Sequence, residues 1–334
     1  MTALSRLAHK LRPVLTVQTA ALALVLFGNW LLFPGFFHLS IQDDRLFGSL
    51  IDVLNRGAPV AILAVGMTLV IATRGMDLSV GAVMAVSGAI AATLVQAGYP
   101  AGIAVPAALL AGVACGAWNG FLIAVLDMQP IVATLVLMVA GRGVAQLITE
   151  GSIVTFDDPW LGYLGTGSLI GLPMPVVILI VVAAIAILIV RRTALGIFIE
   201  PVGINASAAR LSGLHSKLVL LAVYSFCGLC AGVAGILVAA DIQGADANNA
   251  GLWLELDAIL AVVIGGTSLL GGRFSILLSI VGALIIQATN TGILVSGLPP
   301  EFNLIVKAAV ILVILVVQSP RMVGLMRPRS GRPK

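Results

Sequence analysis

Charge is scarce in this sequence. Only 10% of its 334 residues are charged, whereas 60% are hydrophobic. An average soluble domain carries about a quarter charged residues, and a water-facing surface cannot be built from so few ionic side chains. The composition therefore excludes a soluble enzyme, a nucleic-acid-binding module and a disordered chain. It favours a protein whose outer surface contacts lipid.

Cysteine and histidine are also rare. Three cysteines, Cys115, Cys227 and Cys230, are too few for a disulfide framework. Cys227 and Cys230 form a C-x-x-C inside an apolar run, where two small residues one helical turn apart are favoured over a redox pair. The three histidines are scattered and form no H-E-x-x-H pattern. We therefore predict no metal site.

Recognisable catalytic and phosphate-binding motifs are absent. The glycine-rich stretch GGTSLLGGR at 265–273 lacks the Lys-Ser/Thr pair that holds phosphate and magnesium. No serine nucleophile elbow and no pair of catalytic carboxylates can be assembled from the sequence. We therefore predict a non-catalytic chain without a cofactor of its own, and any use of ATP would require a separate subunit.

Long apolar runs are abundant, and each of about 20 residues is enough to cross a bilayer as a helix. The second, third and eighth runs are short or interrupted by glycine, and a signal peptide is the alternative for the first. The ten runs are 14–33, 57–73, 76–96, 101–125, 130–149, 168–190, 218–240, 256–271, 275–295 and 301–318. The sequence thus predicts an all-α polytopic membrane protein: one transmembrane domain, 1–334, with about ten helices.

The distribution of positive charge predicts the orientation. With ten spans, 14 of the 18 lysines and arginines fall on the side of the termini, and only Arg45 and Arg56 fall on the other. Such a bias marks the cytoplasmic side. The N-terminal segment 1–13 and the basic tail 319–334 are therefore predicted to be cytoplasmic, with the tail lying against anionic lipid headgroups rather than nucleic acid.

One cytoplasmic segment, 191–217, is unusually long and polar. Asn205 can cap a short helix over 206–211, and Gly213 can end it in a left-handed conformation. A short, capped, alanine-rich helix with a basic edge suits docking into a groove of another protein. From the residues alone, a plain connecting loop is an equally good interpretation.

Ionisable residues are almost missing from the predicted spans. A proton- or sodium-driven carrier places acids there, but Asp77, Asp257 and the other candidates lie near predicted span ends. Arg142 and Lys307 are the ionisable residues deepest in the spans. Pairing with a distant acid and contact with a substrate are equally good explanations for them.

Amides and tryptophans are the notable polar residues of the spans. Amide groups satisfy sugar hydroxyls, and an indole face packs against the C–H face of a sugar ring. The alternative is hydrogen bonding between helices. The candidate translocation pathway comprises Trp118, Asn119, Gln146, Asn249, Trp253 and Asn290.

Several stretches resemble one known family. Residues 66–89, GMTLVIATRGMDLSVGAVMAVSGA, resemble the G-M-T-x-V-I-x-x-G-G-I-D-L-S-V-G signature of ribose-type sugar ABC importer permeases, and 130–151 and 255–286 resemble two further blocks of that family. The stretches 42–73 and 244–266 are most similar to galactofuranose importer permeases, which pair two different permease chains.

The resemblance implies a complete machine in the bacterial inner membrane. It implies the Type II importer fold, a periplasmic binding protein that delivers a monosaccharide, a second permease chain, different or identical, and a separate ATPase subunit that binds ATP and Mg²⁺. The family's ATPase-contacting pattern G-x-N-x-x-A-A maps onto this chain, so 191–217 is expected to be a coupling segment. Its coupling residues are Gly203, Asn205, Ala208, Ala209, Arg210 and Gly213.

The chain departs from the family pattern at a few positions. Arg74 and Met76 replace the glycine and isoleucine of G-G-I-D, and Phe274 stands where a glycine often follows G-G-R. Arg74 is predicted to be cytoplasmic and to affect the ATPase contact rather than the sugar. Two rival functions stay open: a stand-alone sugar facilitator or secondary carrier, and a membrane enzyme acting on lipid-linked sugar.

Overall fold

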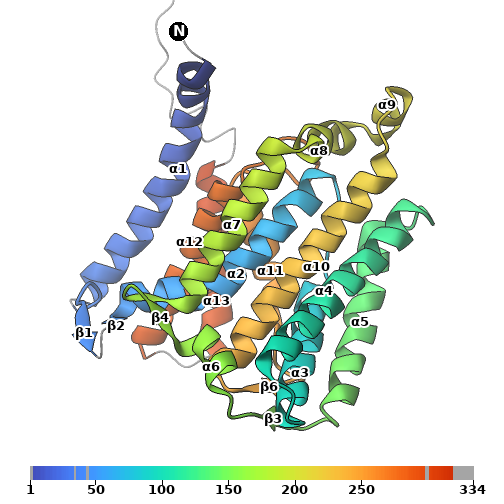
Figure 1. The fold of residues 1–334 in the computed structure, drawn as a ribbon. Helices are drawn as coiled ribbons and strands as arrows, with labels where there is room; N and C mark the ends of the chain where they lie inside the picture. Colours follow the sequence, from blue (N-terminus) through green and yellow to red (C-terminus); the bar gives the residue numbers. More distant parts are fainter. Residues whose placement is uncertain (1–2, 34, 43–44, 298–300, 319–334) are drawn as a thin grey trace, which may run out of the picture.

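The computed structural model describes residues 3–33, 35–42, 45–297 and 301–318, and these form a bundle of helices (Figure 1). The helices are α1 (Ala3–Leu32), α2 (Ser49–Ala72), α3 (Val80–Gln96), α4 (Ala101–Ala124), α5 (Pro130–Ile148), α6 (Pro159–Thr166), α7 (Met174–Arg192), α8 (Ala194–Ile204), α9 (Ala206–Leu211), α10 (Ser216–Asp241), α11 (Leu254–Ile264), α12 (Ile276–Val295) and α13 (Glu301–Gln318).

Short antiparallel strand pairs lie at one end of the bundle, opposite α8 and α9 (Figure 1). They are β1 (Ser40–Gln42) with β2 (Arg45–Phe47), β3 (Ile153–Thr155) with β6 (Gly244–Asp246), and β4 (Ser168–Leu169) with β5 (Leu172–Pro173). The first and third pairs are hairpins, whereas β3–β6 joins two distant connections. The all-α prediction therefore needs a small correction at the connections between helices.

Within the described residues, six helices are long and apolar enough to cross a membrane: α2, α4, α5, α7, α10 and α12. Shorter apolar helical stretches cover Val17–Leu32, Val80–Gln96, Ala194–Ile204 and Leu304–Val313. Each of the ten predicted runs overlaps a helix. The prediction of a helical, polytopic membrane protein is confirmed, while the number of crossings and the side of the termini stay predictions. The tail 319–334 lies outside the described residues.

Helix α2 forms the centre of the bundle. Its most apolar window is 78% buried, because α7, α10, α11 and α12 pack around it. A helix covered on every side needs an apolar residue at nearly every position, and α2 has this composition from Gly57 to Ala72. Cys227 and Cys230 of α10 are buried, unoxidised thiols that pack against Gly66 of α2. Their predicted role as small packing residues is thus confirmed.

Some predicted boundaries are wrong. The run 256–271 is helical only over α11, because its glycines at 265 and 266 end the helix and Gly266 has a left-handed φ of +88°. Residues 168–173 form the β4–β5 hairpin instead of the start of a span. Helix α8 was not predicted from the sequence, and Pro201 lies inside it.

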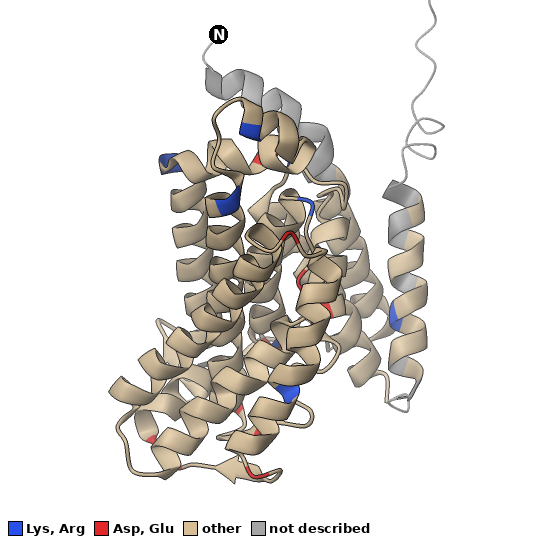
Figure 2. Ribbon diagram, turned by 90° about the vertical axis from the view of Figure 1, so that its right-hand side faces the viewer, with Lys and Arg blue, Asp and Glu red and all other residues tan. Residues whose placement is uncertain are grey.

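Charged residues lie mainly near the ends of the helices. Figure 2 shows most of the lysines and arginines toward the upper end of the bundle, with few of them on the helices below. Arg142 and Lys307 are exceptions, because they belong to α5 and α13. Their partners identify the candidate site.

Candidate translocation and coupling sites

The chain between α2 and α3 is a non-helical break, residues 73–79, inside the bundle. Asp77 organises it: its Oδ1 accepts hydrogen bonds from the Ser79 amide at 3.0 Å and from the Ser79 hydroxyl at 2.6 Å. The side chain of Asp77 also lies just before the positive end of α3, which favours a carboxylate there. The break is therefore a defined structure.

Side chains from neighbouring helices form further hydrogen bonds with the break. Asn119 of α4 donates through Nδ2 to the Ser79 hydroxyl at 2.9 Å, and the hydroxyls of Thr134 and Tyr224 each donate to the Met76 carbonyl at 3.4 Å. Irregular backbone at membrane depth is tolerated only where protein or a cavity covers it. Asn119 has no exposed surface, so in this conformation it holds the break together instead of facing a passing solute.

Two acids lie inside the bundle, which corrects the expectation that its interior is nearly free of them. Asp77 is 1% exposed and Asp257 is 6% exposed. Both lie near span ends, as predicted, but these ends belong to the short helices α3 and α11, which begin within the bundle. The error thus comes from assuming that every span end lies at the membrane surface.

A second break precedes α11. After β6 the chain turns into the bundle and reaches the first turn of α3, where the backbones of Gly81 and Gly251 touch. A Cβ on either glycine would overlap the carbonyl oxygen of the other, and Gly251 also has a left-handed φ of +71°. Glycine is thus required on both sides of this contact.

The contact lies deep in the bundle. Gly81 is 15 residues before the last residue of α3, Gln96, a distance of about 22 Å at 1.5 Å per residue. The start of α3 and the chain just before α11 therefore meet far from the last turn of α3. In transporters, broken helices whose ends meet near the middle of the membrane commonly surround the substrate site.

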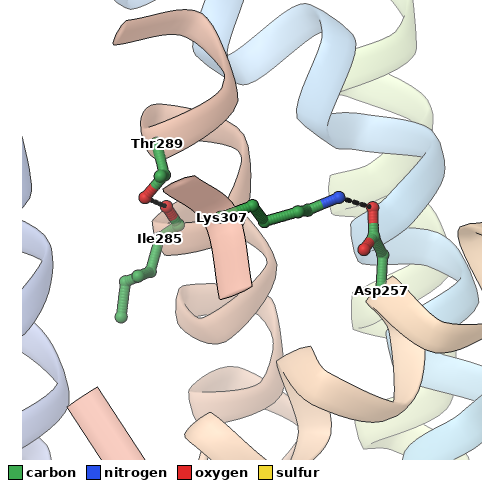
Figure 3. A network of polar contacts seen from close by, with 4 residues as sticks. All are labelled: Asp257, Ile285, Thr289 and Lys307. Carbon is green, nitrogen blue, oxygen red and sulfur yellow. Dashed lines mark hydrogen bonds and ion pairs between the residues drawn. The ribbon is translucent and has the colours of Figure 1, made fainter. Parts of the chain in front are cut away.

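Both cations that were predicted deep in the spans hold the segment around α11. Arg142 donates through Nη1 to the carbonyls of Ala247 at 2.9 Å and Ala250 at 2.6 Å. Lys307 forms an ion pair with Asp257, with 2.7 Å between Nζ and Oδ2 (Figure 3). We call residues 246–257 the clamped segment, because α5 holds one of its ends and α13 holds the other. For Lys307, the alternative of pairing with an acid is confirmed.

Three of the predicted pathway residues lie together on this segment and α5. Gln146 donates through Nε2 to Asn248 Oδ1 at 2.8 Å, and Asn249 donates through Nδ2 to Asp246 Oδ2 at 2.7 Å. Trp253 is 58% exposed. The Asn249 hydrogen bond is the main cause of a lowered pKa at Asp246, so this carboxylate is ionised at neutral pH.

Trp118 and Asn290 lie elsewhere. Trp118 is 53% exposed on α4 and stacks on Phe121 with 6.1 Å between ring centroids. Exposed apolar residues recur along the same helix, as at Ile103 and Leu110, which is typical of a lipid-facing stripe. Asn290 is on α12, where its buried Oδ1 has no hydrogen-bond partner among the described residues.

The predicted short helix in the coupling segment is present as α9. The Asn205 side chain accepts hydrogen bonds from the amides of Ser207 at 3.1 Å and Ala208 at 3.0 Å, and Gly213 follows the helix with φ +83°. The capping signals read from the sequence are thus confirmed. Ala208 and Arg210 are exposed, whereas Ala209 faces inward.

Gly203 does not lie on the surface. It is buried where α8 ends, and a Cβ there would overlap the carbonyl oxygen of Ala72, the last residue of α2. The same Ala72 carbonyl accepts a 2.9 Å hydrogen bond from the Gly272 amide in the loop after α11. The ends of α8 and α2 and the loop 265–275 therefore meet at Gly203.

Sequence reasoning missed three exposed apolar side chains on this face. Leu211 of α9 is 91% exposed, Ile204 of α8 is 66% exposed, and Leu270 of the loop after α11 is 72% exposed. The side chain of Ile204 lies next to Gly272. The available signal was apolar residues within otherwise polar connections, because exposed apolar side chains that lie together often mark an interaction surface.

Arg74 adopts a left-handed backbone conformation, with φ +65°, at the position where the related block has glycine. This conformation costs roughly 1–2 kcal/mol for a residue with a Cβ, although glycine also gains backbone entropy in the unfolded chain. Arg74→Gly is therefore expected to increase stability by about 1 kcal/mol, measured as a higher thermal unfolding midpoint in detergent. Arg273→Gly, at an exposed residue with negative φ, is the control and should give no gain. A lower midpoint for Arg74→Gly would contradict the prediction.

Several known proteins are similar to this chain. Residues 49–315 match the family described as branched-chain amino acid transport system / permease component. The chain belongs to this permease family. It is 59% identical to the galactofuranose transporter permease protein YtfT of Escherichia coli over 317 residues, 95% of this chain and 93% of that protein.

Other members of the permease family named after sugars are also similar. The fructose import permease protein FruF of Bifidobacterium longum is 42% identical, covering 83% of this chain and 79% of that protein. The ribose import permease protein RbsC of Escherichia coli is 42% identical, covering 82% and 86%. No solved structure matches the chain.

Proposed function

We propose that this protein is the transmembrane permease subunit of an ATP-driven sugar importer, and that it forms half of the pathway for galactofuranose or a related monosaccharide. The single observation that carries the proposal is the near full-length identity of 59% to a galactofuranose transporter permease. The exposed amides beside Trp253 on the clamped segment support it, because such groups match sugar hydroxyls and ring faces.

The proposed arrangement is a Type II importer fold in the bacterial inner membrane, with ten crossings and both termini in the cytoplasm. The gathering of basic residues at the end that carries α8 and α9 supports this orientation (Figure 2). The strand pairs then lie on the outer side. A periplasmic sugar-binding protein would dock there, and a second permease chain, different or identical, would complete the pathway.

The proposed ATPase contact is the face made by α9 and its exposed apolar neighbours. Leu211 and Ile204 supply apolar contact, and Arg210 supplies positive charge at its edge. An amphipathic helix that enters a groove is a recurrent mode of recognition. ATP and Mg²⁺ belong to the ATPase subunit, and this chain converts its movement into opening and closing of the pathway.

The packing at Gly203 supports a route by which movement of the ATPase reaches the pathway. A push on α9 reaches Gly203 at the end of α8, then the end of α2 and the loop 265–275. This loop continues directly from α11, whose first turn carries Asp257 and touches α3. Displacement of the loop therefore moves α11, and with it the clamped segment that carries Asn249 and Trp253.

The exposed face of the clamped segment is the proposed lining of the pathway. Gln146, in the last turn of α5, and Asn249 are exposed amides that also bond to Asn248 and Asp246. Exposed polar groups of this kind are expected to face a water-filled cavity at the interface with the second permease rather than lipid. Asn290 stays a candidate, and Trp118 is the candidate with the least support because it stacks on the lipid-facing stripe of α4.

A reconstitution experiment tests the proposed function. The chain, its ATPase and its partner permease are placed in vesicles, and uptake of labelled galactofuranose from the binding protein is measured with ATP and with a non-hydrolysable analogue. Uptake is expected only with ATP. Equal uptake without hydrolysis would support the stand-alone carrier instead.

The ATPase contact is tested separately by Leu211→Asp. Because Leu211 is 91% exposed, the change should leave folding intact but put a charge into the proposed interface, which costs an interface several kcal/mol when the charge is unpaired. We expect the ATPase to be lost on gentle purification. Ile170→Asp, at a residue 95% exposed in the β4–β5 hairpin, is the matched control and should retain it. Retention in both variants would exclude α9 from the contact.

A further inference from the structure

An apolar crevice lies on the outside of the bundle near α8. Its volume is about 190 Å³, and the six side chains that line it are all apolar: Leu69, Ala186, Ile189, Leu195, Ala222 and Phe226. Helix α2 forms the floor through Leu69, whereas α7 and α10 form the two walls and Leu195 of α8 closes one end. Figure 1 shows α2 between α7 and α10.

Positive charge is concentrated beside one wall of the crevice. Helix α7 ends with Arg191 and Arg192 in its last turn, and both side chains are exposed. Arg192 follows the wall residue Ile189 by three positions, one helical turn nearer the end of α7. The crevice therefore combines an apolar slot with two cations at the level where the helix ends.

This combination matches one kind of molecule. An acyl chain fits an apolar slot, and a phosphate-bearing headgroup fits paired guanidinium groups, which bind phosphate through several hydrogen bonds. Anionic lipid attracts basic residues next to a membrane helix. A protein segment is a poorer match for this place, since the exposed side chains between the ends of the wall helix α7 are apolar, as at Ile180, Ile185 and Leu188.

We propose that the crevice between α7 and α10 is a binding site for one anionic phospholipid, with an acyl chain on Ile189, Ala222 and Phe226 and its phosphate on Arg191 and Arg192. The lipid lies directly against Leu195, in the first turn of α8. It thus supports the start of α8, at the opposite end of this helix from Gly203. The site stands independently of which sugar the protein transports.

Native mass spectrometry of the purified full-length chain tests the proposal. The chain is reconstituted in vesicles of equal phosphatidylglycerol and phosphatidylethanolamine, extracted gently, and weighed with its bound lipid. We expect one retained phospholipid, enriched in phosphatidylglycerol. Ala222→Phe, which fills the slot from its exposed wall, should lose most of it, and the smaller Ala222→Leu should lose part.

One further variant tests the contact with the lipid headgroup, and another serves as a control. Arg191→Gln with Arg192→Gln should keep the retained lipid but lose the preference for phosphatidylglycerol. Ala184→Phe, at an exposed position of α7 outside the crevice, is the control and should behave like the unaltered chain. Equal retention in Ala222→Phe and Ala184→Phe would overturn the proposal. A change in oligomeric state in Ala222→Phe, without loss of lipid, would assign the crevice to a second protein chain instead. Because the measurement uses the permease alone, its outcome does not depend on whether the protein transports sugar.

Discussion

Lys307→Met is expected to be among the most destabilising single substitutions in the described part of the chain. It leaves Asp257, which is 6% exposed, as a buried carboxylate without its cation. Removing one partner of a buried ion pair typically costs about 3–5 kcal/mol. The thermal unfolding midpoint in detergent should therefore fall sharply, and α13 should become accessible to proteolysis, because the ion pair joins α13 to the start of α11 (Figure 3).

A double substitution shows whether the charge pair itself is responsible. Lys307→Met combined with Asp257→Asn removes both charges, so no uncompensated ion remains buried, and most of the lost stability should return. If the two substitutions are additive instead, the pair contributes little and Lys307 acts only through packing. ATP-dependent uptake by the double variant then reports how far the position of the clamped segment depends on this ion pair.

Gly203→Val is expected to abolish ATP-driven uptake. The new side chain would overlap the Ala72 carbonyl and force α8 away from the end of α2. Overpacking of this kind typically costs about 1–3 kcal/mol, and here it also breaks the junction that joins the coupling segment to the loop 265–275. ATP hydrolysis by the bound ATPase should continue while uptake of labelled sugar falls to background.

Gly102→Val is the matched control for that substitution. Gly102 is an exposed glycine in the first turn of α4, where an added Cβ would meet nothing within 4 Å, so uptake should persist. Normal uptake by Gly203→Val would show that coupling does not pass through this junction. Loss of both hydrolysis and uptake would indicate that the ATPase no longer binds, because displacement of α8 also displaces α9, and coupling through the buried junction would then be contradicted.

Local signals predicted much of the fold. Apolar runs of bilayer length identify the helices around α2, because lipid leaves the chain few other ways to satisfy its backbone. Asn205 and Gly213 mark the two ends of α9 through side-chain and left-handed caps. These features depend on residues a few positions apart, so the sequence alone contains them.

The breaks and their partners could not be predicted in the same way. Arg142 and Lys307 are 165 positions apart and contact the clamped segment from different helices, so neither position indicates the other. The residue type of Asn119 places it with the pathway amides, but only its depth next to Ser79 reveals its structural role. Such assignments require knowledge of which helices are neighbours.

The contact between Gly81 and Gly251 has a consequence for the energy barrier of movement. Two surfaces that interlock through side chains must change rotamers, or separate, before either can shift. At this contact backbone faces backbone, and the Glu255 carboxylate is the side-chain group nearest to Gly81, so α11 can shift along the start of α3 with few changes of rotamer. The contacts that oppose this shift lie at the edges of the clamped segment: the hydrogen bonds of the Arg142 guanidinium and the ion pair of the Lys307 ammonium. The bundle thus combines a weakly restrained contact at its centre with polar contacts at its edges that fix the position of α11.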